Sequence, residues 1–395
     1  MTTENPLDAF ATQPFRLGPI PELVFGAGEV KKIADHAAAL RASGGEAPIL
    51  LIADATLAEM DATAPVAEAL GAAGATVEVH AEIAGEPKAA DIDAAAERVR
   101  MTGPGLVVAM GGGSAIDAAK IAAAVAASKE GVLHYKLGEN PLPRRQMPMI
   151  AVPTTAGTGA EVTATAVFAG PDGKKLWVHD AAAKPDVVIL DPETTVSLPA
   201  TLTAWTGLDA FVHALEACTN RRRFAAADMH SFLALQLIAG ALETAVKTPT
   251  DLAARGRLLL GAAYAGIGID ACGTAIAHTI SHALSGLGPI HHGFATALGL
   301  DATLAWSVEE DDGRFARAAR ACGLDNAAAL PGWFSGLMAA CGVEKRLPES
   351  FKEKTAGDLA DEMRLPANAP MREATARTVT DADIDAFAAR IMDLA

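Results

Sequence analysis

The chain has 395 residues, of which 51% are hydrophobic and 20% charged, a balance typical of a globular rather than a disordered protein. This length is sufficient for two domains, each with its own core. The formal net charge of −16 disfavours nucleic acids and anionic membrane surfaces as partners, because both require clustered Lys and Arg side chains.

Short apolar segments alternate with amphipathic ones in the first half of the chain. The apolar segments predict buried strands at 49–53, 75–80, 105–110, 149–152 and 187–190. Helical spacing is found between them, most clearly at 92–101 and 114–127. Strands that alternate with helices in this way indicate an α/β domain, with a parallel sheet covered on both faces.

The pattern changes after Pro199, where strand candidates end and helical spacing continues to the last residues. We predict helices at 204–219, 226–247, 251–269, 275–287, 311–321 and 380–394, with Thr380 as a capping residue of the last one. The chain is therefore expected to consist of an α/β nucleotide-binding domain, residues 1–195, and an all-helical domain, residues 196–395. A ligand cleft is expected between them.

The cysteines and the N-terminus bear on the cellular compartment. Cys218, Cys272, Cys322 and Cys341 are scattered without a CxxC pair, which indicates free thiols in a reducing compartment. Residues 1–6 lack the basic and apolar features of a signal peptide, and no segment reads as a membrane span. We expect a cytoplasmic protein that forms a homodimer or a larger homo-oligomer.

A glycine-rich loop follows the strand predicted at 105–110. Without side chains, the backbone amides of residues 111–114 can approach a pyrophosphate, and the helix that begins near Ser114 adds the positive end of its dipole. An ordinary tight turn would show the same glycines. A second loop, 152–161, also follows a strand and is rich in hydroxyls and glycine, which favours a nucleotide held between neighbouring strand ends.

Asp54 ends the first of these core strands. A carboxylate at this position can accept hydrogen bonds from an adenosine ribose and would repel a 2′-phosphate, so NAD(H) is favoured over NADP(H). The alternative is that Asp54 only caps the helix that follows.

Five polar residues of the helical half have the spacing of a metal site. Asp209 and His213 are four residues apart, as are His278 and His282, so each pair lies on one face of a helix. His292 follows after a Gly-Pro turn. One Asp with three His would bind a divalent transition metal and leave a position open for a substrate oxygen, as catalytic sites do. The alternatives are a solvated helix face for the first pair and hydrogen-bonded core histidines for the others.

These motifs resemble the iron-containing (group III) alcohol dehydrogenases, whose fold is dehydroquinate synthase-like. The resemblance extends over almost the whole chain and rests on several segments in the family's order. They are Phe25–Gly28, Gly111–Ser114 with Asp117 and Lys120, Pro153–Thr158, Pro185–Pro192, Gly207–Glu216 and His278–Gly293.

The resemblance implies roles for individual residues. It implies that Asp209, His213, His278 and His292 bind the metal, and that His282 is a non-ligand histidine beside the nicotinamide and the substrate. Asp117 matches a family position near the cofactor, although a carboxylate in the first turn of a helix is also favourable for the helix itself. The implied NAD contacts are Asp54, Gly112, Gly113, Ser114, Thr154, Thr155, Thr158 and Lys175.

The chain departs from the family pattern in a few places. Glu86 precedes Pro87 where Asn is frequent, and Ile269 and Ala271 replace the Phe and Asn that many members carry before the metal histidines. Thr296 stands where Asn usually follows the last His-Gly. Because the change at 269 alters the expected wall of the pocket, no substrate is inherited from a relative.

The function implied is an NAD-dependent alcohol dehydrogenase or aldehyde reductase for a small primary alcohol or its aldehyde. The family favours Fe²⁺, whereas the ligand set also accepts Zn²⁺. The alternatives are a maleylacetate reductase-like or glycerol dehydrogenase-like relative, a dehydroquinate synthase-type lyase, and a nucleotide-binding regulator without catalysis. A lyase would need several Lys and Arg for an acidic phosphorylated substrate, and the metal segments carry almost none.

Overall fold

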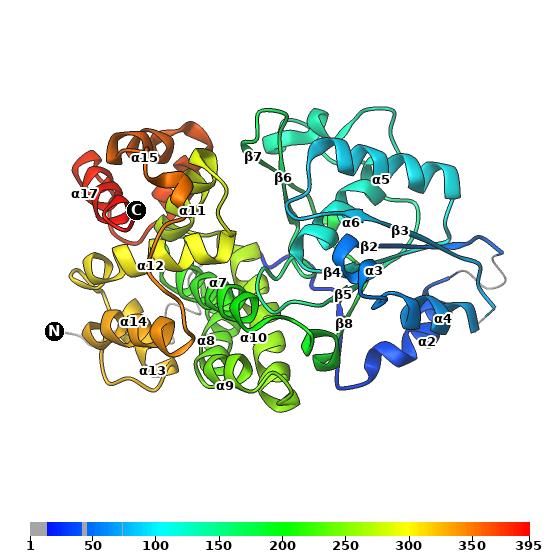
Figure 1. The fold of residues 1–395 in the computed structure, drawn as a ribbon, viewed down its shortest axis with the longest axis horizontal. Helices are drawn as coiled ribbons and strands as arrows, with labels where there is room; N and C mark the ends of the chain where they lie inside the picture. Colours follow the sequence, from blue (N-terminus) through cyan, green and yellow to red (C-terminus); the bar gives the residue numbers. More distant parts are fainter. Residues whose placement is uncertain (1–13, 42–45, 73) are drawn as a thin grey trace. The chain divides into compact units, whose positions relative to one another are not determined.

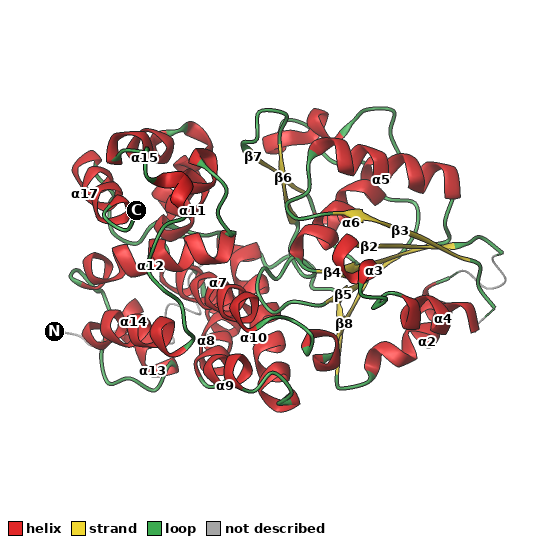
Figure 2. Ribbon diagram, viewed as in Figure 1, coloured by secondary structure: helices red, strands yellow, loops and turns green. Residues whose placement is uncertain are grey.

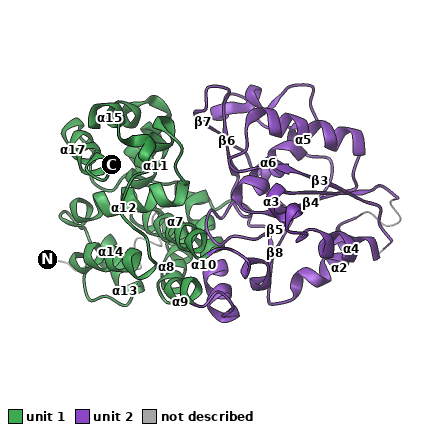
Figure 3. Cartoon of the chain, viewed as in Figure 1, with its two compact units in different colours: residues 1–19, 200–247, 261–395 green, residues 20–199, 248–260 purple. Residues whose placement is uncertain are grey.

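The computed structural model describes residues 14–41, 46–72 and 74–395. They form two compact units (Figure 3). One contains residues 20–199 and 248–260; the other contains residues up to 19, 200–247 and 261–395. The N-terminal segment 1–6, for which no signal peptide is expected, lies outside the described residues.

A six-stranded parallel sheet forms the centre of the first unit (Figures 1 and 2). Its strand order is β1-β8-β5-β4-β2-β3. The central strands β4 and β5 are buried at every residue, as expected for a sheet covered on both faces. The strands are β1 (Glu22–Phe25), β2 (Ile49–Asp54), β3 (Val77–Ile83), β4 (Leu106–Gly111), β5 (Met149–Pro153) and β8 (Val187–Leu190).

The helices of this unit follow the strands along the chain. They are α2 (Ile33–Leu40), α3 (Ala55–Glu59), α4 (Ala64–Ala72), α5 (Ala89–Thr102) and α6 (Gly113–Val125). All five strands predicted from apolar segments are present, and the parallel α/β architecture is confirmed.

The sequence analysis missed an antiparallel hairpin, β6 (Thr165–Ala169) with β7 (Lys175–His179). Each strand has only five residues; β6 alternates half-buried with buried residues, whereas β7 is buried only at Val178. Its two strands pair with each other rather than with the large sheet. A segment of this kind carries less apolar signal than a strand buried on both faces.

The second unit is helical, as predicted (Figure 2). Helix α7 packs against α8 and α12, and α11 packs against α12. Its helices are α7 (Ala200–Thr219), α8 (Ala225–Ala239), α9 (Leu242–Lys247), most of α10 (Leu252–Cys272), α11 (Ile276–Leu287), α12 (His292–Val308), α13 (Arg314–Ala321), α14 (Leu330–Ala340), α15 (Ala356–Arg364), α16 (Ala369–Ala374) and α17 (Asp381–Met392).

Helix boundaries differ from the prediction in informative ways. The prediction of a single helix at 226–247 is wrong. This segment forms two helices, α8 and α9, which are separated at Gly240, a residue with poor helix propensity. Helix α13 begins at Arg314, and Asp311 lies before it, where its carboxylate accepts hydrogen bonds from first-turn amides. Thr380 caps α17 as predicted, in a reciprocal capping box with Asp383.

The four cysteines are unpaired, and burial raises the pKa of each thiol, to about 11 for Cys272 and Cys341.

None of the described helices is by itself long and apolar enough to span a membrane. Helices α10 and α11 together have the length and composition of a span, but the pair is bent by 95°.

Candidate metal centre and nucleotide site

Helix α7 presents Asp209 and His213 on one face. Their spacing of four residues stacks the two side chains along the helix axis, and Glu216 continues the same face. Asp209 and His213 retain only 2% and 5% of their accessible surface. The alternative of a solvated helix face is therefore wrong for this pair. Polar groups buried so deeply require partners.

His278 and His282 come from α11, one helical turn apart. His278 is buried, whereas His282 is partly exposed. Nδ1 of His278 lies 2.7 Å from Oε2 of Glu216, so its other ring nitrogen, Nε2, is the one that faces Asp209, at 3.8 Å from Oδ1.

His292 is the first residue of α12. The start of α12 lies very close to α7 at Gly293. A Cβ atom on Gly293 would lie 2.4 Å from the backbone oxygen of Trp205 and 3.1 Å from Cβ of Asp209. Glycine at this position therefore lets the two helices approach closely enough for His292 to reach Asp209.

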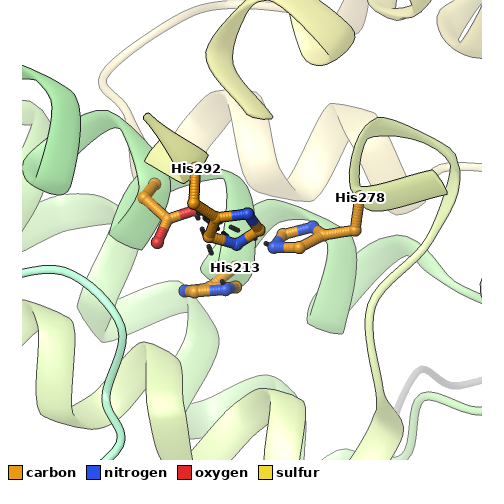
Figure 4. Close-up of side chains that lie close together, drawn as sticks. His213, His278 and His292 are labelled. Carbon is orange, nitrogen blue, oxygen red and sulfur yellow. Dashed lines mark ion pairs between the residues drawn. The ribbon is translucent and has the colours of Figure 1, made fainter. Parts of the chain in front are cut away.

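The four predicted metal ligands meet at one point. In Figure 4 the rings of His213, His278 and His292 converge from three segments of the chain. Oδ1 of Asp209 lies 3.9 Å from Nε2 of His213 and 3.8 Å from Nε2 of both His278 and His292. One donor atom from each of the four residues lies within 4.8 Å of all the others.

These distances fit a metal ion better than a hydrogen-bonded cluster. A hydrogen bond would bring nitrogen and oxygen to about 2.7–3.2 Å. A tetrahedral ion with bonds of about 2.0–2.2 Å separates its donors by roughly 3.3–3.6 Å. Among the described residues, Oδ1 of Asp209 and Nε2 of His278 have no hydrogen-bond partner although both are buried. The residues present therefore fit a divalent transition metal.

The cluster is open on one side. The side chains of Asp209, His213 and His278 are 3%, 6% and 3% exposed, whereas that of His292 is 28% exposed. The centre of the His282 ring lies 5.8 Å from that of His292, and His282 does not belong to the set of four. An ion here would be held by protein on its buried side, with access from the side of His292.

In the α/β unit, three loops leave neighbouring strands at the same edge of the sheet. Strand β4 lies between β2 and β5, and their ends are in register at Ala53 with Met110 and at Gly111 with Pro153. The carboxyl ends of parallel strands are where open α/β sheets bind ligands. Asp54 is the last residue of β2, and the glycines and the predicted threonines lie at or directly after the ends of β4 and β5.

The two predicted phosphate loops are in contact. A Cβ atom on Gly113 would lie 2.5 Å from Oγ1 of Thr158, so only glycine permits this approach. Gly112 lies beside Thr155, and the amide of Thr154 donates to the carbonyl of Gly111 at 2.9 Å. Ser114 lies in the first turn of α6. Backbone amides and hydroxyls are thus gathered at a helix N-terminus, the arrangement that binds phosphate.

Asp54 and Lys175 already have protein partners. Oδ1 of Asp54 accepts a hydrogen bond from the amide of Thr56 at 2.8 Å. Asp54 therefore caps α3, which is the helix-capping role considered as the alternative to a ribose contact. Nζ of Lys175 lies 3.3 Å from Oε1 of Glu86, one of the positions where the chain departs from the family pattern.

Asp117 is held within the protein. Its Oδ1 lies 3.2 Å from Nζ of Lys120, and its Oδ2 accepts from the amide of Val167 at 2.9 Å. Burial raises the pKa of this carboxyl group, and Lys120 opposes that shift. Both oxygens are therefore engaged by the chain itself, and Asp117 connects α6 to β6 through the amide of Val167.

Lys120 joins the second loop to α6. It is fully buried, and its Nζ donates to the carbonyl oxygens of Ala160 and Thr165, both at 2.8 Å. Glu161 is buried nearby, and burial raises its pKa to about 7. Helix α6 thus carries both the first phosphate loop and the anchor of the second.

The sequence analysis gave no role to Glu216 or Gly293. A signal for Glu216 was available, because Asp209, His213 and Glu216 follow the i, i+4, i+7 spacing of one helix face. No local signal marks Gly293, since its role depends on how closely α12 approaches α7.

Comparison with known proteins agrees with this geometry. Residues 21–192 match the family described as iron-containing alcohol dehydrogenase, and residues 203–389 match the C-terminal part of the Fe-containing alcohol dehydrogenase family. The chain is 34% identical over 278 residues to a probable alcohol dehydrogenase of Salmonella typhimurium, covering 70% of each protein.

It is 33% identical over 277 residues to the sulfoacetaldehyde reductase of Bilophila wadsworthia, again covering 70% of each. Among solved structures, sulfoacetaldehyde reductase from Bifidobacterium kashiwanohense in complex with NAD⁺ superposes with a TM-score of 0.84 at 27% identity, covering 94% of this chain and 97% of that one.

The chain belongs to the iron-containing alcohol dehydrogenase family. The enzyme therefore has the dehydroquinate synthase-like fold of this family, and the resemblance described above is confirmed. It is an oxidoreductase, and its helical unit contains a cluster of one Asp and three His that could hold a metal ion.

Proposed function

We propose that this enzyme interconverts a small alcohol and its aldehyde with NAD(H), using a metal ion held by Asp209, His213, His278 and His292. The observation that carries the proposal is the arrangement of the three imidazole Nε2 atoms, each 3.8 or 3.9 Å from Oδ1 of Asp209. Fe²⁺ is the ion that the family favours, and Zn²⁺ suits the same nitrogen and oxygen donors.

The chain supplies binding and orientation for this reaction. A bound metal ion would supply Lewis-acid polarisation of the substrate oxygen. The four ligands fix the position of that ion, and the partly exposed side of His292 leaves access for a substrate. His282, one helical turn after His278, would take or give the proton of the alcohol hydroxyl.

The nucleotide would be held by the loops at the ends of β2, β4 and β5. Bound NAD would supply the hydride chemistry. Gly112, Gly113 and Ser114 would offer backbone amides to the pyrophosphate, and Thr154, Thr155 and Thr158 would offer hydroxyls. Asp54 would accept from the adenosine ribose with the carboxylate oxygen that does not cap α3, and would repel the 2′-phosphate of NADP(H). Lys175 is proposed as a further NAD contact. Asp117 is proposed as part of the NAD site through its bond to Lys120, which holds the second loop.

The wider setting is part of the proposal. The four free cysteines, three of them buried and Cys322 partly exposed, support a reducing compartment, the cytoplasm. We also propose a homo-oligomer, which light scattering after gel filtration would measure. The division into a nucleotide domain up to residue 195 and a metal domain from 196 is supported by the two compact units. Segment 14–19, however, groups with the helical unit, and 248–260 groups with the α/β unit.

Turnover with a panel of primary alcohols and aldehydes tests the function. Protein reconstituted with iron should change the absorbance of NADH with at least one of them and use NADP(H) poorly. His278→Ala should remain folded but lose the metal and the turnover. Full activity of that variant after chelation would show that the site is assigned wrongly, and equal use of NADP(H) would remove the role given to Asp54.

A further inference from the structure

Glu216 is a buried carboxylate whose two oxygens both receive backbone amides. It extends from α7 to the N-terminus of α11, with 4% of its surface exposed. Oε2 accepts from the amide of Ala275 at 2.6 Å, and Oε1 accepts from the amide of Ala277 at 2.7 Å. First-turn amides have no partner within their own helix, and α11 has no cap from its own N-cap residue, so Glu216 supplies one.

The same carboxylate also determines which nitrogen of His278 carries the proton. Nδ1 of His278 lies 2.7 Å from Oε2. Because backbone amides can only donate, a carboxylate that receives two of them is an acceptor, and Nδ1–H must be the donor to it. A neutral imidazole has one N–H, so Nε2 then presents its lone pair. Nε2 is the atom that lies 3.8 Å from Oδ1 of Asp209.

Ser281 contacts Nδ1 of His292 as Glu216 contacts that of His278, but through a hydroxyl, which can donate as well as accept. Its hydroxyl donates to the carbonyl of His292 at 3.2 Å, and its oxygen lies 2.9 Å from Nδ1 of that residue. A hydroxyl has one proton to donate, so once it is given to the carbonyl the oxygen accepts from Nδ1–H. Nε2 of His292 again presents its lone pair towards the point shared with Asp209.

We propose that Glu216 and Ser281 are positioning residues that fix the tautomer and the ring orientation of His278 and His292 for metal binding. A metal binds only the deprotonated ring nitrogen, so a ring held in the other tautomer is not a ligand. Glu216 has the larger part, because its bonds are buried and charge-assisted and because it fixes the start of α11 as well as the ring. This inference rests on the metal site of the proposed function.

Glu216→Gln is the sharpest perturbation, because it keeps the volume and removes one acceptor. Three N–H donors face this side chain, and an amide offers one oxygen and one NH₂ group. If the NH₂ group takes the place of Oε2, it faces both Nδ1 of His278 and the amide of Ala275, so it stabilises the tautomer whose Nε2 is protonated and also opposes a backbone donor. If it takes the place of Oε1, it opposes the amide of Ala277, and the start of α11 must move. Both arrangements weaken the metal site.

Asp311→Asn is the matched control. Asp311 lies before α13, and its carboxylate accepts from the amides of Gly313, Phe315 and Ala316 at 3.0, 2.9 and 2.9 Å. It thus receives the same number of N–H donors at a helix N-terminus, with no histidine among them. For Ser281→Ala the control is Ser231→Ala, a buried serine in α8 whose hydroxyl donates to the carbonyl of Ala227.

The test measures Zn²⁺ affinity of the metal-free proteins by competition with a fluorescent chelator, together with the thermal unfolding of each metal-free protein. Glu216→Gln should bind Zn²⁺ about 10–100-fold more weakly, the range found when the outer partner of a ligand histidine is lost. Ser281→Ala should bind more weakly by a smaller factor. Asp311→Asn and Ser231→Ala should keep the affinity of the unmodified chain, even where their unfolding temperature falls.

The outcomes separate this inference from the function on which it rests. Unchanged Zn²⁺ affinity in Glu216→Gln would overturn the role of Glu216 while leaving the metal site intact. An equal loss in Asp311→Asn would show that affinity follows stability alone, which also overturns it. If the unmodified chain fails to bind Zn²⁺ or Fe²⁺, the proposed metal site fails and the inference with it.

Discussion

Replacing Gly293 by alanine tests the packing that brings His292 to the other ligands. Gly293 is the second residue of α12, and the helical backbone there accepts alanine without strain. The added Cβ would nevertheless lie 2.4 Å from the backbone oxygen of Trp205, and it would lie 3.1 Å from Cβ of Asp209. Neither neighbour is the flexible end of a side chain, so the start of α12 must move away from α7.

The size of the effect follows from that distance. Real Cβ atoms do not approach other heavy atoms closer than 3.0 Å, so α12 must shift by at least about 0.6 Å. Overpacking of this kind costs about 1–3 kcal/mol of stability. His292 is the adjacent residue, and a misplacement of about 1 Å at a reacting centre can lower the rate by about 100-fold. We expect a loss of that order in kcat/KM, together with weaker metal binding.

Gly336→Ala is the control, because nothing lies within 4 Å of a Cβ built at this position in α14. It should be neutral or stabilising by about 0.5–1 kcal/mol, as expected for alanine in a helix. The assay is Zn²⁺ affinity and kcat/KM for both variants, with thermal unfolding alongside. If Gly293→Ala binds Zn²⁺ and turns over as the unmodified enzyme does, the close approach of α12 does not position His292.

Three further predictions concern other groups. Lys120→Met leaves Asp117, whose side chain is only 13% exposed, without its cation, which should cost about 3–5 kcal/mol of unfolding free energy. The change should also weaken NAD⁺ binding at unchanged metal content. Denaturant titration and NAD⁺ titration measure the two effects, and unaltered NAD⁺ affinity would contradict the role of Lys120 as an anchor. His282→Ala should keep a full equivalent of metal but lower kcat by about 10²–10⁴-fold with an altered pH dependence, whereas loss of the metal would make His282 a ligand. Burial raises the pKa of Glu161 from 4.5 to about 7 in the folded chain, so the folded state binds this proton more tightly than the unfolded state does. The free energy of unfolding should therefore fall by about 3 kcal/mol as the pH rises from about 4.5 to about 7, and Glu161→Gln should remove that fall. If the unfolding curves of the variant differ between pH 5 and pH 8 as much as those of the unmodified chain, the reasoning is refuted.

The local features of this protein could be determined from its sequence. Short apolar segments predict the central strands, because a strand of a parallel sheet that is covered on both faces has no polar face. The spacing of Asp209 with His213 and of His278 with His282 places each pair on one helix face whatever the rest of the chain does. Thr380 likewise predicts the start of α17 from local sequence alone, because the hydrogen bonds of a capping box join residues only three positions apart.

The tertiary structure decided which of these residues meet. Sequence spacing treats His282 and His292 alike, and only the packing of α11 and α12 places His292 within the ligand set and leaves His282 beside it. Glu216 and His278 are separated by 62 positions in the chain, and Asp117 and Val167 by 50. Contacts over such distances depend on how whole helices and strands pack, so short-range periodicity carries no record of them.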